Sequence, residues 1–185
     1  MPDQRTQQPV LERVLENTPD EAFYDGDATF TLERRLSREP DWVWRMLTTA
    51  AGAARWSPCV PTSDLTGTGP AEFQEEPGAE LVDGTVTRFD PPHALAHAWG
   101  RERLEWALSP ADGYTDLNLT MTCSSEDMLL ACAAGWHICL ATLEAMADGE
   151  ETARVVGPAS FAYGWEGLRG SYAQRFDLPE PAPLD

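Results

Sequence analysis

The sequence contains no lysine: all 13 basic residues are arginines, set against 31 acidic residues, and the net charge is −18. Without lysine, Schiff-base chemistry and a phosphate-loop lysine are excluded. The strong negative charge would repel phosphate backbones, so we expect no nucleic-acid partner. We interpret the excess of acidic residues as a means of keeping the protein soluble.

Targeting and membrane signals are also missing from the sequence. Residues 1–5 lack the apolar core of a signal peptide, and no uninterrupted run of about 18 apolar residues is present. We therefore expect a cytoplasmic protein without a membrane span. A hydrophobic content of 42% over 185 residues suits one domain with extensions and a sizeable core.

Recognisable catalytic and cofactor motifs are absent as well. The sequence has no glycine-rich phosphate loop, no serine nucleophile elbow and no Cys–His signature. Its three histidines have no convergent carboxylate, so we expect no cofactor and no metal. The cysteines lack close metal-ligand spacing, and we interpret them as buried apolar residues in a reducing compartment: Cys59, Cys123, Cys132 and Cys139.

Alternating apolar and polar residues predict a series of strands, interrupted by one pair of short helices and followed by a long helix. The long helix, at 126–147, has an apolar stripe about 120° wide, and Gly149 ends it. The short helices are expected at 41–49 and 50–56, with Pro40 in a first turn. The predicted strands are 29–36, 63–66, 71–74, 80–89, 94–99, 102–108 and 115–123.

Three parts of the chain are expected: an arm at 1–26, a domain at 27–148 and an extension at 149–185. The arm is acidic and polar, which fits a small helix or a loose segment. The long helix carries small or apolar residues on the face opposite its main stripe, so we expect the extension or a second subunit to cover that face. The proline-rich residues 179–183 are expected to form a disordered end.

The order of a strand, two short helices, several strands and a long helix resembles the helix-grip fold of the START-like superfamily, also called SRPBCC. Within it, residues 43–48 and 54–56 resemble the first helices of the group similar to the activator of Hsp90 ATPase. Residues 84–99 resemble its hairpin, and Gly135, Trp136, Leu140 and Leu143 resemble its final helix. One departure is that residues 66–79 lack the Gly-Gly-aromatic strand of many relatives.

The resemblance, which covers roughly residues 27–148, implies an α+β fold. A curved antiparallel sheet of about six or seven strands would surround one long C-terminal helix, with the two short helices after the first strand. Such an arrangement encloses a pocket between the concave sheet and the helix. Fold similarity alone does not assign a function, because this superfamily contains carriers, receptors, cyclases and proteins without known activity.

Strand parity indicates which side chains face this pocket. An aromatic lining suits a flat hydrophobic ligand, although the same side chains could simply fill the core. The predicted lining, with Trp56 at a rim, is Trp56, Leu95, Trp99, Leu104, Trp106, Leu119, Met121, Trp136, Cys139, Leu140 and Leu143.

Two polar residues lie on the same apolar strand faces and are the candidate catalytic groups. His97 could act as a general acid or base, because the pKa of histidine lies near neutrality. Arg34 could bind a carboxylate or an enolate oxygen. The alternatives are a structural histidine or an exposed strand end for His97, and a surface charge on an edge strand for Arg34.

Three functions remain open from the sequence. The first is the binding of a small hydrophobic molecule, extended to a polyketide-cyclase-like enzyme that positions its substrate and assists with one proton transfer. The second, implied by the resemblance to the Hsp90 activator, is a protein-interaction module. The third is a homodimer without a ligand. We favour ligand binding; the sequence does not name the ligand, the reaction or the oligomeric state.

Overall fold

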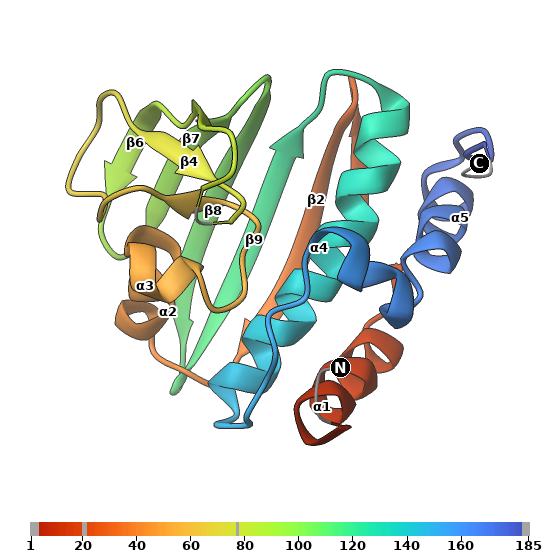
Figure 1. Ribbon diagram of the computed structural model, residues 1–185, viewed down its shortest axis with the longest axis horizontal. Coiled ribbons are helices and arrows are strands. Elements are labelled where there is room, and N and C mark those ends of the chain that lie inside the picture. Colours follow the sequence, from red (N-terminus) through yellow and green to blue (C-terminus); the bar gives the residue numbers. More distant parts are fainter. Residues whose placement is uncertain (1–3, 20–21, 77, 183–185) are drawn as a thin grey trace.

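The computed structural model describes residues 4–19, 22–76 and 78–182. The protein has three layers: an antiparallel sheet, a long helix across one face of it, and two further helices on the far side of that helix (Figure 1). The elements are α1 (Gln4–Glu16), β1 (Ala22–Gly26), β2 (Thr29–Leu36), α2 (Pro40–Thr48), α3 (Ala50–Ala53), β3 (Val60–Pro61), β4 (Glu72–Gln74), β5 (Val82–Asp83), β6 (Val86–Asp90), β7 (Ala94–Trp99), β8 (Glu102–Ala111), β9 (Tyr114–Thr122), α4 (Glu126–Ala147), the 3₁₀ helix η2 (Gly157–Tyr163) and α5 (Trp165–Phe176).

The main sheet has six antiparallel strands in the order β1-β2-β9-β8-β7-β6. Its register sets Trp106 opposite both Leu95 and Leu119, so the apolar side chains of the central strands share one face. The long helix α4 packs on this face (Figure 1). The α+β helix-grip fold predicted from the sequence is therefore confirmed.

Two expected segments at the sheet's edges differ from the prediction. The arm at 1–26 contains a strand, β1, which pairs with β2 so that Ala22 lies opposite Leu32. Only Ala22 of β1 is buried, so its sequence lacks the alternation that marks a strand. The strand expected at 63–66 is a loop, and the short strand β3 precedes it.

The single strand expected at 80–89 is two strands, β5 and β6, which belong to different sheets. The strand is interrupted at Gly84. Next to it, the Asp83 side chain accepts hydrogen bonds from both the backbone N–H and the hydroxyl of Thr85, at 3.0 and 2.7 Å. Such an Asx turn competes with the backbone hydrogen bonds that pair one strand with its neighbour. Gly84 also passes so close to the ring of Phe73 that a Cβ would overlap it.

The outer face of α4 is covered within a single chain. Ile138 and Ala141 are fully buried and pack in one cluster with Val10 and Val14 of α1. On the side of the extension, α5 also packs against α4 (Figure 1). The unusual apolar composition of this face thus has a cause inside the chain, and no second subunit is needed to explain it. The proline-rich end expected at 179–183 includes residue 183, which lies outside the described residues.

By length and composition alone, α4 could cross a membrane. However, 72% of its most apolar window is buried inside the protein. Its composition is therefore that of a core helix between two layers, and α4 gives no indication of a membrane.

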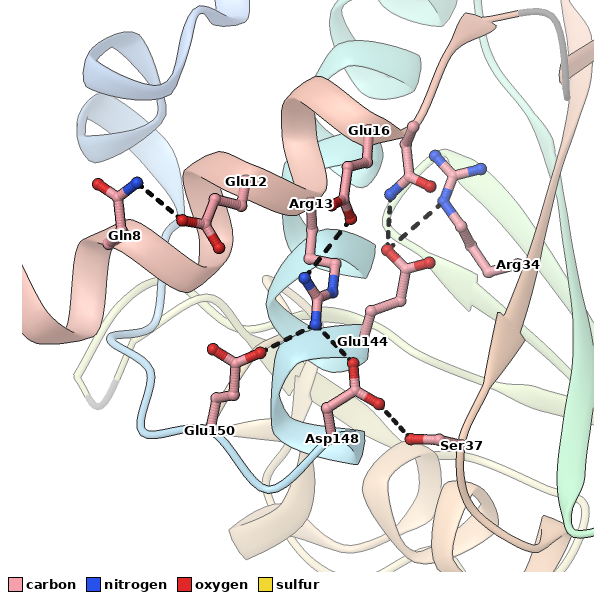
Figure 2. A network of polar contacts seen from close by, with 10 residues as sticks. Gln8, Glu12, Arg13, Glu16, Arg34, Ser37, Glu144, Asp148 and Glu150 are labelled. Carbon is pink, nitrogen blue, oxygen red and sulfur yellow. Dashed lines mark hydrogen bonds and ion pairs between the residues drawn. The ribbon is translucent and has the colours of Figure 1, made fainter.

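A polar seam joins α1 to the C-terminal end of α4 (Figure 2). The guanidinium of Arg13 lies 2.6 Å from the carboxylate of Asp148 and 2.9 Å from that of Glu150. One turn earlier on α4, Glu144 accepts a hydrogen bond of 2.6 Å from the side-chain amide of Asn17. Arg13 of α1 thus pairs with two acidic residues at the end of α4, which ties the two helices together.

We predict that Arg13→Ala lowers the free energy of unfolding by about 1–2 kcal/mol, because it leaves two partly buried carboxylates without their shared partner. Urea unfolding measures the change. Arg103→Ala is a matched control, since its pair with Glu105 is more than half exposed on the outer sheet face and should contribute under about 0.5 kcal/mol. Equal effects of the two substitutions would contradict a structural role for the seam.

Candidate functional site

Three of the expected pocket residues form a buried aromatic cluster between the sheet and α4. The ring centroids of Trp56, Trp106 and Trp136 lie 5.3–6.0 Å apart, mostly in edge-to-face arrangements. Trp56 is fully buried and donates its indole N–H to the Met46 carbonyl at 3.1 Å, so it belongs to the core and not to a rim. These rings fill the centre of the space in which the sequence placed a ligand.

A hollow of about 400 Å³ lies beside this cluster. One wall comes from residues 131–139 of α4 with Trp99 and two loop residues, and the other comes from the C-terminal extension. Most of the exposed lining is apolar. The lining residues are Pro58, Glu75, Trp99, Ala131, Cys132, Gly135, Trp136, Cys139, Val155, Val156, Gly157, Pro158, Ser160, Phe161 and Trp165.

The structure divides the predicted lining into two groups. Trp99, Trp136 and Cys139 line the hollow. The others do not line it and lie in the buried core: Trp56, Leu95, Leu104, Trp106, Leu119, Met121, Leu140 and Leu143. The strand parity identified side chains that face inward, but it could not distinguish those that touch a hollow from those that touch each other.

The extension is held as a wall by polar contacts. Arg154 donates two hydrogen bonds to the Ser57 carbonyl, at 3.1 and 2.8 Å, and another to the Glu75 carbonyl. Trp165 donates its indole N–H to the Ala131 carbonyl of α4 at 3.1 Å, and the ring of Phe161 packs edge-on against it. The sequence pattern suggested that the extension covers α4, but it gave no signal that residues 155–161 line a site.

One buried polar atom of α4 has no partner among the described residues. Trp136 is 1% exposed, and its indole N–H is inaccessible and has no hydrogen-bond acceptor there. An unsatisfied buried donor costs about 1–3 kcal/mol, but this one does not reach the surface of the hollow. The indole N–H of Trp56, in contrast, is satisfied by a backbone carbonyl.

His97 lies in the core beside the cluster and does not line the hollow. Trp106 donates its indole N–H to Nε2 of His97 at 3.2 Å, so Nδ1 carries the proton and donates to the Ala98 carbonyl at 2.8 Å. The ring of Phe73 stacks on the imidazole at 4.8 Å, and burial lowers the pKa of His97 to about 4. Both ring nitrogens are used, which favours a structural histidine; a catalytic role for His97 stays a prediction.

Arg34 lies on the inner sheet face near α4, far from His97. Its Nη1 donates to the Glu33 carbonyl at 2.7 Å, and its Nε lies 3.9 Å from the Glu144 carboxylate (Figure 2). In the sheet, Arg34 and His97 are offset by four residues along the strand direction and lie three strands apart. This corresponds to a distance of about 20 Å. The structure therefore does not bring the two candidate catalytic groups together.

Metal and thiol chemistry have little support in the part of the chain that the structure describes. No group of three or more His, Cys, Asp or Glu side chains within 4–19, 22–76 and 78–182 is placed to hold a metal ion. Burial raises the pKa of Cys139 to about 12 and that of Cys59 well above its ordinary value. Thiols held in this way are poor nucleophiles.

Comparison with known proteins identifies the domain but not a ligand. A model of the family described as activator of Hsp90 ATPase homolog 1-like protein matches residues 37–148, more than half of the chain. No curated protein gives a significant match. The matched segment ends before the extension, so one wall of the hollow lies outside the family match.

Several solved structures share the fold. CalU16 from Micromonospora echinospora is 22% identical, with a TM-score of 0.63, and the match covers 80% of this chain and 87% of that chain. EF2215 from Enterococcus faecalis, described as a conserved protein of unknown function, is 15% identical over 92% of this chain and 95% of its own, also with a TM-score of 0.63. DynU16, described as a putative protein in the dynemicin biosynthetic locus, is 18% identical over 68% and 49%, with a TM-score of 0.58. At these identities the likeness establishes the fold alone.

Proposed function

Because this chain belongs to the activator of Hsp90 ATPase homolog 1-like family and has the helix-grip fold, we propose that it binds a small apolar molecule containing a ring system. The binding site is the hollow between α4 and the C-terminal extension. The observation that carries this proposal is the hollow itself, whose volume of about 400 Å³ and mostly apolar lining suit a small ligand. Two partly exposed indole rings, those of Trp99 and Trp165, supply flat surfaces for such a ligand.

A further observation supports binding over a merely imperfect core. The fold is shared by DynU16, whose description places it in a biosynthetic locus. That description supports a small-molecule role without naming a ligand for this chain.

A polyketide-cyclase-like reaction would require a proton-transferring group at the bound molecule. His97 and Arg34 do not line the hollow, and among its lining residues Glu75 is the one carboxylate and Ser160 the one hydroxyl. We therefore propose binding, with positioning of the ligand as the chain's contribution, and assign no proton transfer.

We predict that Gly135→Leu weakens binding of the neutral fluorescent probe N-phenylnaphthylamine by at least about tenfold. A Cβ at Gly135 would lie 3.8 Å from Nε1 of Trp165, so the first carbon fits and the rest of the leucine would occupy the hollow. The substitution also improves helix propensity by about 1 kcal/mol, so loss of binding would not arise from unfolding. Probe fluorescence gives the affinity, and urea unfolding gives the stability.

Gly167→Leu is the matched control. Gly167 is an exposed glycine of α5 with open space around its Cβ position, and it does not line the hollow. Its replacement should leave probe affinity unchanged. Absence of probe binding to the unaltered protein, or equal affinity in the Gly135→Leu and Gly167→Leu variants, would refute a site in this hollow.

A further inference from the structure

A second hollow, also of about 400 Å³, adjoins the first. The two share Glu75, Trp99 and Cys132, so a ligand in one can extend into the other along the ring of Trp99. The second hollow is lined by more acidic residues than the first. Its remaining lining residues are Ala79, Glu80, Val82, Glu102 and Met128.

Three carboxylates thus border an otherwise apolar surface: those of Glu75, Glu80 and Glu102. Glu102 is held in place, since its two carboxylate oxygens accept hydrogen bonds from the backbone N–H and the hydroxyl of Ser124, at 2.7 and 2.8 Å. Among the residues that the structure describes, no basic residue lines either hollow. Arg154 is nearby, but it donates its hydrogen bonds to the backbone carbonyls of Ser57 and Glu75.

Resting on the proposed function, we propose that the ligand is a cationic amphiphile. Its ring system lies in the first hollow, and its amine lies among the carboxylates of the second. The two hollows supply separate signals for this class. The apolar lining of the first selects a ring system, and the acidic rim of the second selects a positive charge on the attached group.

The two hollows differ in charge, because three carboxylates border the second and one borders the first. Glu75 and Glu80 are exposed and Glu102 is half-buried, so water screens each carboxylate and the attraction for a cation is the sum of three modest contributions. The face of Trp99, which reaches both hollows, adds an attraction for the same cation. An anion in this position would meet three like charges, so the site should discriminate by the sign of the charge as well as by hydrophobicity.

The test uses three probes of matched length: naphthylpropylamine, naphthylpropanol and naphthylbutanoate, each titrated as a competitor of N-phenylnaphthylamine. We expect the amine to bind about five- to tenfold more tightly than the alcohol, the anion to bind more weakly than the alcohol, and added salt to reduce the difference. If the alcohol does not displace the neutral probe, the proposed function itself fails. If the alcohol displaces it and the amine is no tighter, only this inference is overturned.

Charge-neutralising variants separate a local site from general attraction by a protein of net charge −18. The double variant Glu75→Gln/Glu80→Gln should remove most of the preference for the amine over the alcohol. The control Glu33→Gln/Glu105→Gln removes the same charge from exposed positions on the outer sheet face, and the preference should persist. Equal losses in both double variants would show that only the overall charge attracts the amine, and the inference would be overturned.

Discussion

Lowering the pH from about 7.5 to about 4.5 should reduce the free energy of unfolding by about 5 kcal/mol, because two histidines are buried in their neutral form. Burial lowers the pKa of His97 to about 4 from an ordinary value of 6.5. Burial, together with the nearby positive charge of Arg34, lowers the pKa of His137 by the same amount, also to about 4. Each histidine contributes about 2–3 kcal/mol to the change over this interval.

The direction follows from proton binding. Between the folded value of about 4 and the unfolded value of 6.5, the unfolded chain binds protons at both histidines that the folded protein does not bind. The contribution of the two histidines to the free energy of unfolding is therefore fully present above about pH 7. It declines as the pH falls through 6.5 toward 4. The carboxylates of Asp116 and Asp148 have lowered pKa values, so their contribution is lost below the ordinary value of 3.8, outside this interval.

The position of His137 explains why its protonation should be costly. Its Nε2 lies 3.1 Å from the carbonyl of Val14, which can only accept, so Nε2 carries the proton and Tyr172 donates its hydroxyl to Nδ1 at 2.8 Å. One neutral imidazole on α4 thus joins α1 and α5. A second proton would oppose the donation from Tyr172 and would place a charge in a fully buried position near Arg34.

Urea unfolding at the two pH values measures this effect within each variant. His97→Gln and His137→Gln should each remove about half of the pH-dependent loss, whatever each substitution costs at pH 7.5. His93→Gln is the control, because His93 is exposed at a turn. If all three variants kept the full pH dependence, the loss would have to come from groups other than the buried histidines. A loss of about 5 kcal/mol is comparable with the whole stability of many domains, so acid unfolding near pH 4 is expected.

The fold was predictable because its signals are local and periodic. Leu104, Trp106 and Leu108 alternate with exposed residues, so a period of two indicated one buried face before any pairing was known. The turn at Gly100 followed from its position between two such segments, and the register confirms it by setting Trp99 opposite Glu102. These features depend on neighbouring residues alone.

The site was less predictable because its walls come from segments that are remote in the chain. Trp136 and Trp106 carry the same inward-facing signal, yet Trp136 lines the hollow while Trp106 is enclosed by other rings. The difference depends on Trp56, whose ring packs against both of them, and on Arg154, which holds the extension over α4. Neither contact has a periodic signature in the sequence.

The same limit explains the wrong prediction of one strand at 80–89. Its residues are typical of a strand, but the sequence does not show that Gly84 lies against a distant side chain. The backbone N–H of Gly84 donates to the Ala71 carbonyl at 2.9 Å, which holds Gly84 against the buried ring of Phe73. That ring in turn stacks on His97, with its plane only 4° from that of the imidazole. A glycine inside an apparent strand can therefore indicate a neighbour that leaves no room for a side chain.

Gly84→Ala should consequently lower the free energy of unfolding by about 2–4 kcal/mol, since the added Cβ would overlap two ring carbons of Phe73 and the ring is fully buried. The backbone of Gly84 does not require glycine, so the cost is one of space and not of conformation. Gly67→Ala is the control, because nothing lies near its Cβ position. Urea unfolding should show a change below about 0.5 kcal/mol for this control.

A double-mutant cycle with Phe73→Leu identifies the cause. Removing the ring should recover at least about 1 kcal/mol of the cost of Gly84→Ala, because the overlap is with ring carbons. If Gly84→Ala cost the same in both backgrounds, the strain would have to come from the backbone, and the explanation for the break between β5 and β6 would fail. Since Phe73 also stacks on His97, the cycle further predicts that the pH-dependent loss shrinks in Phe73→Leu, as water gains access to the imidazole and its pKa rises toward the ordinary value.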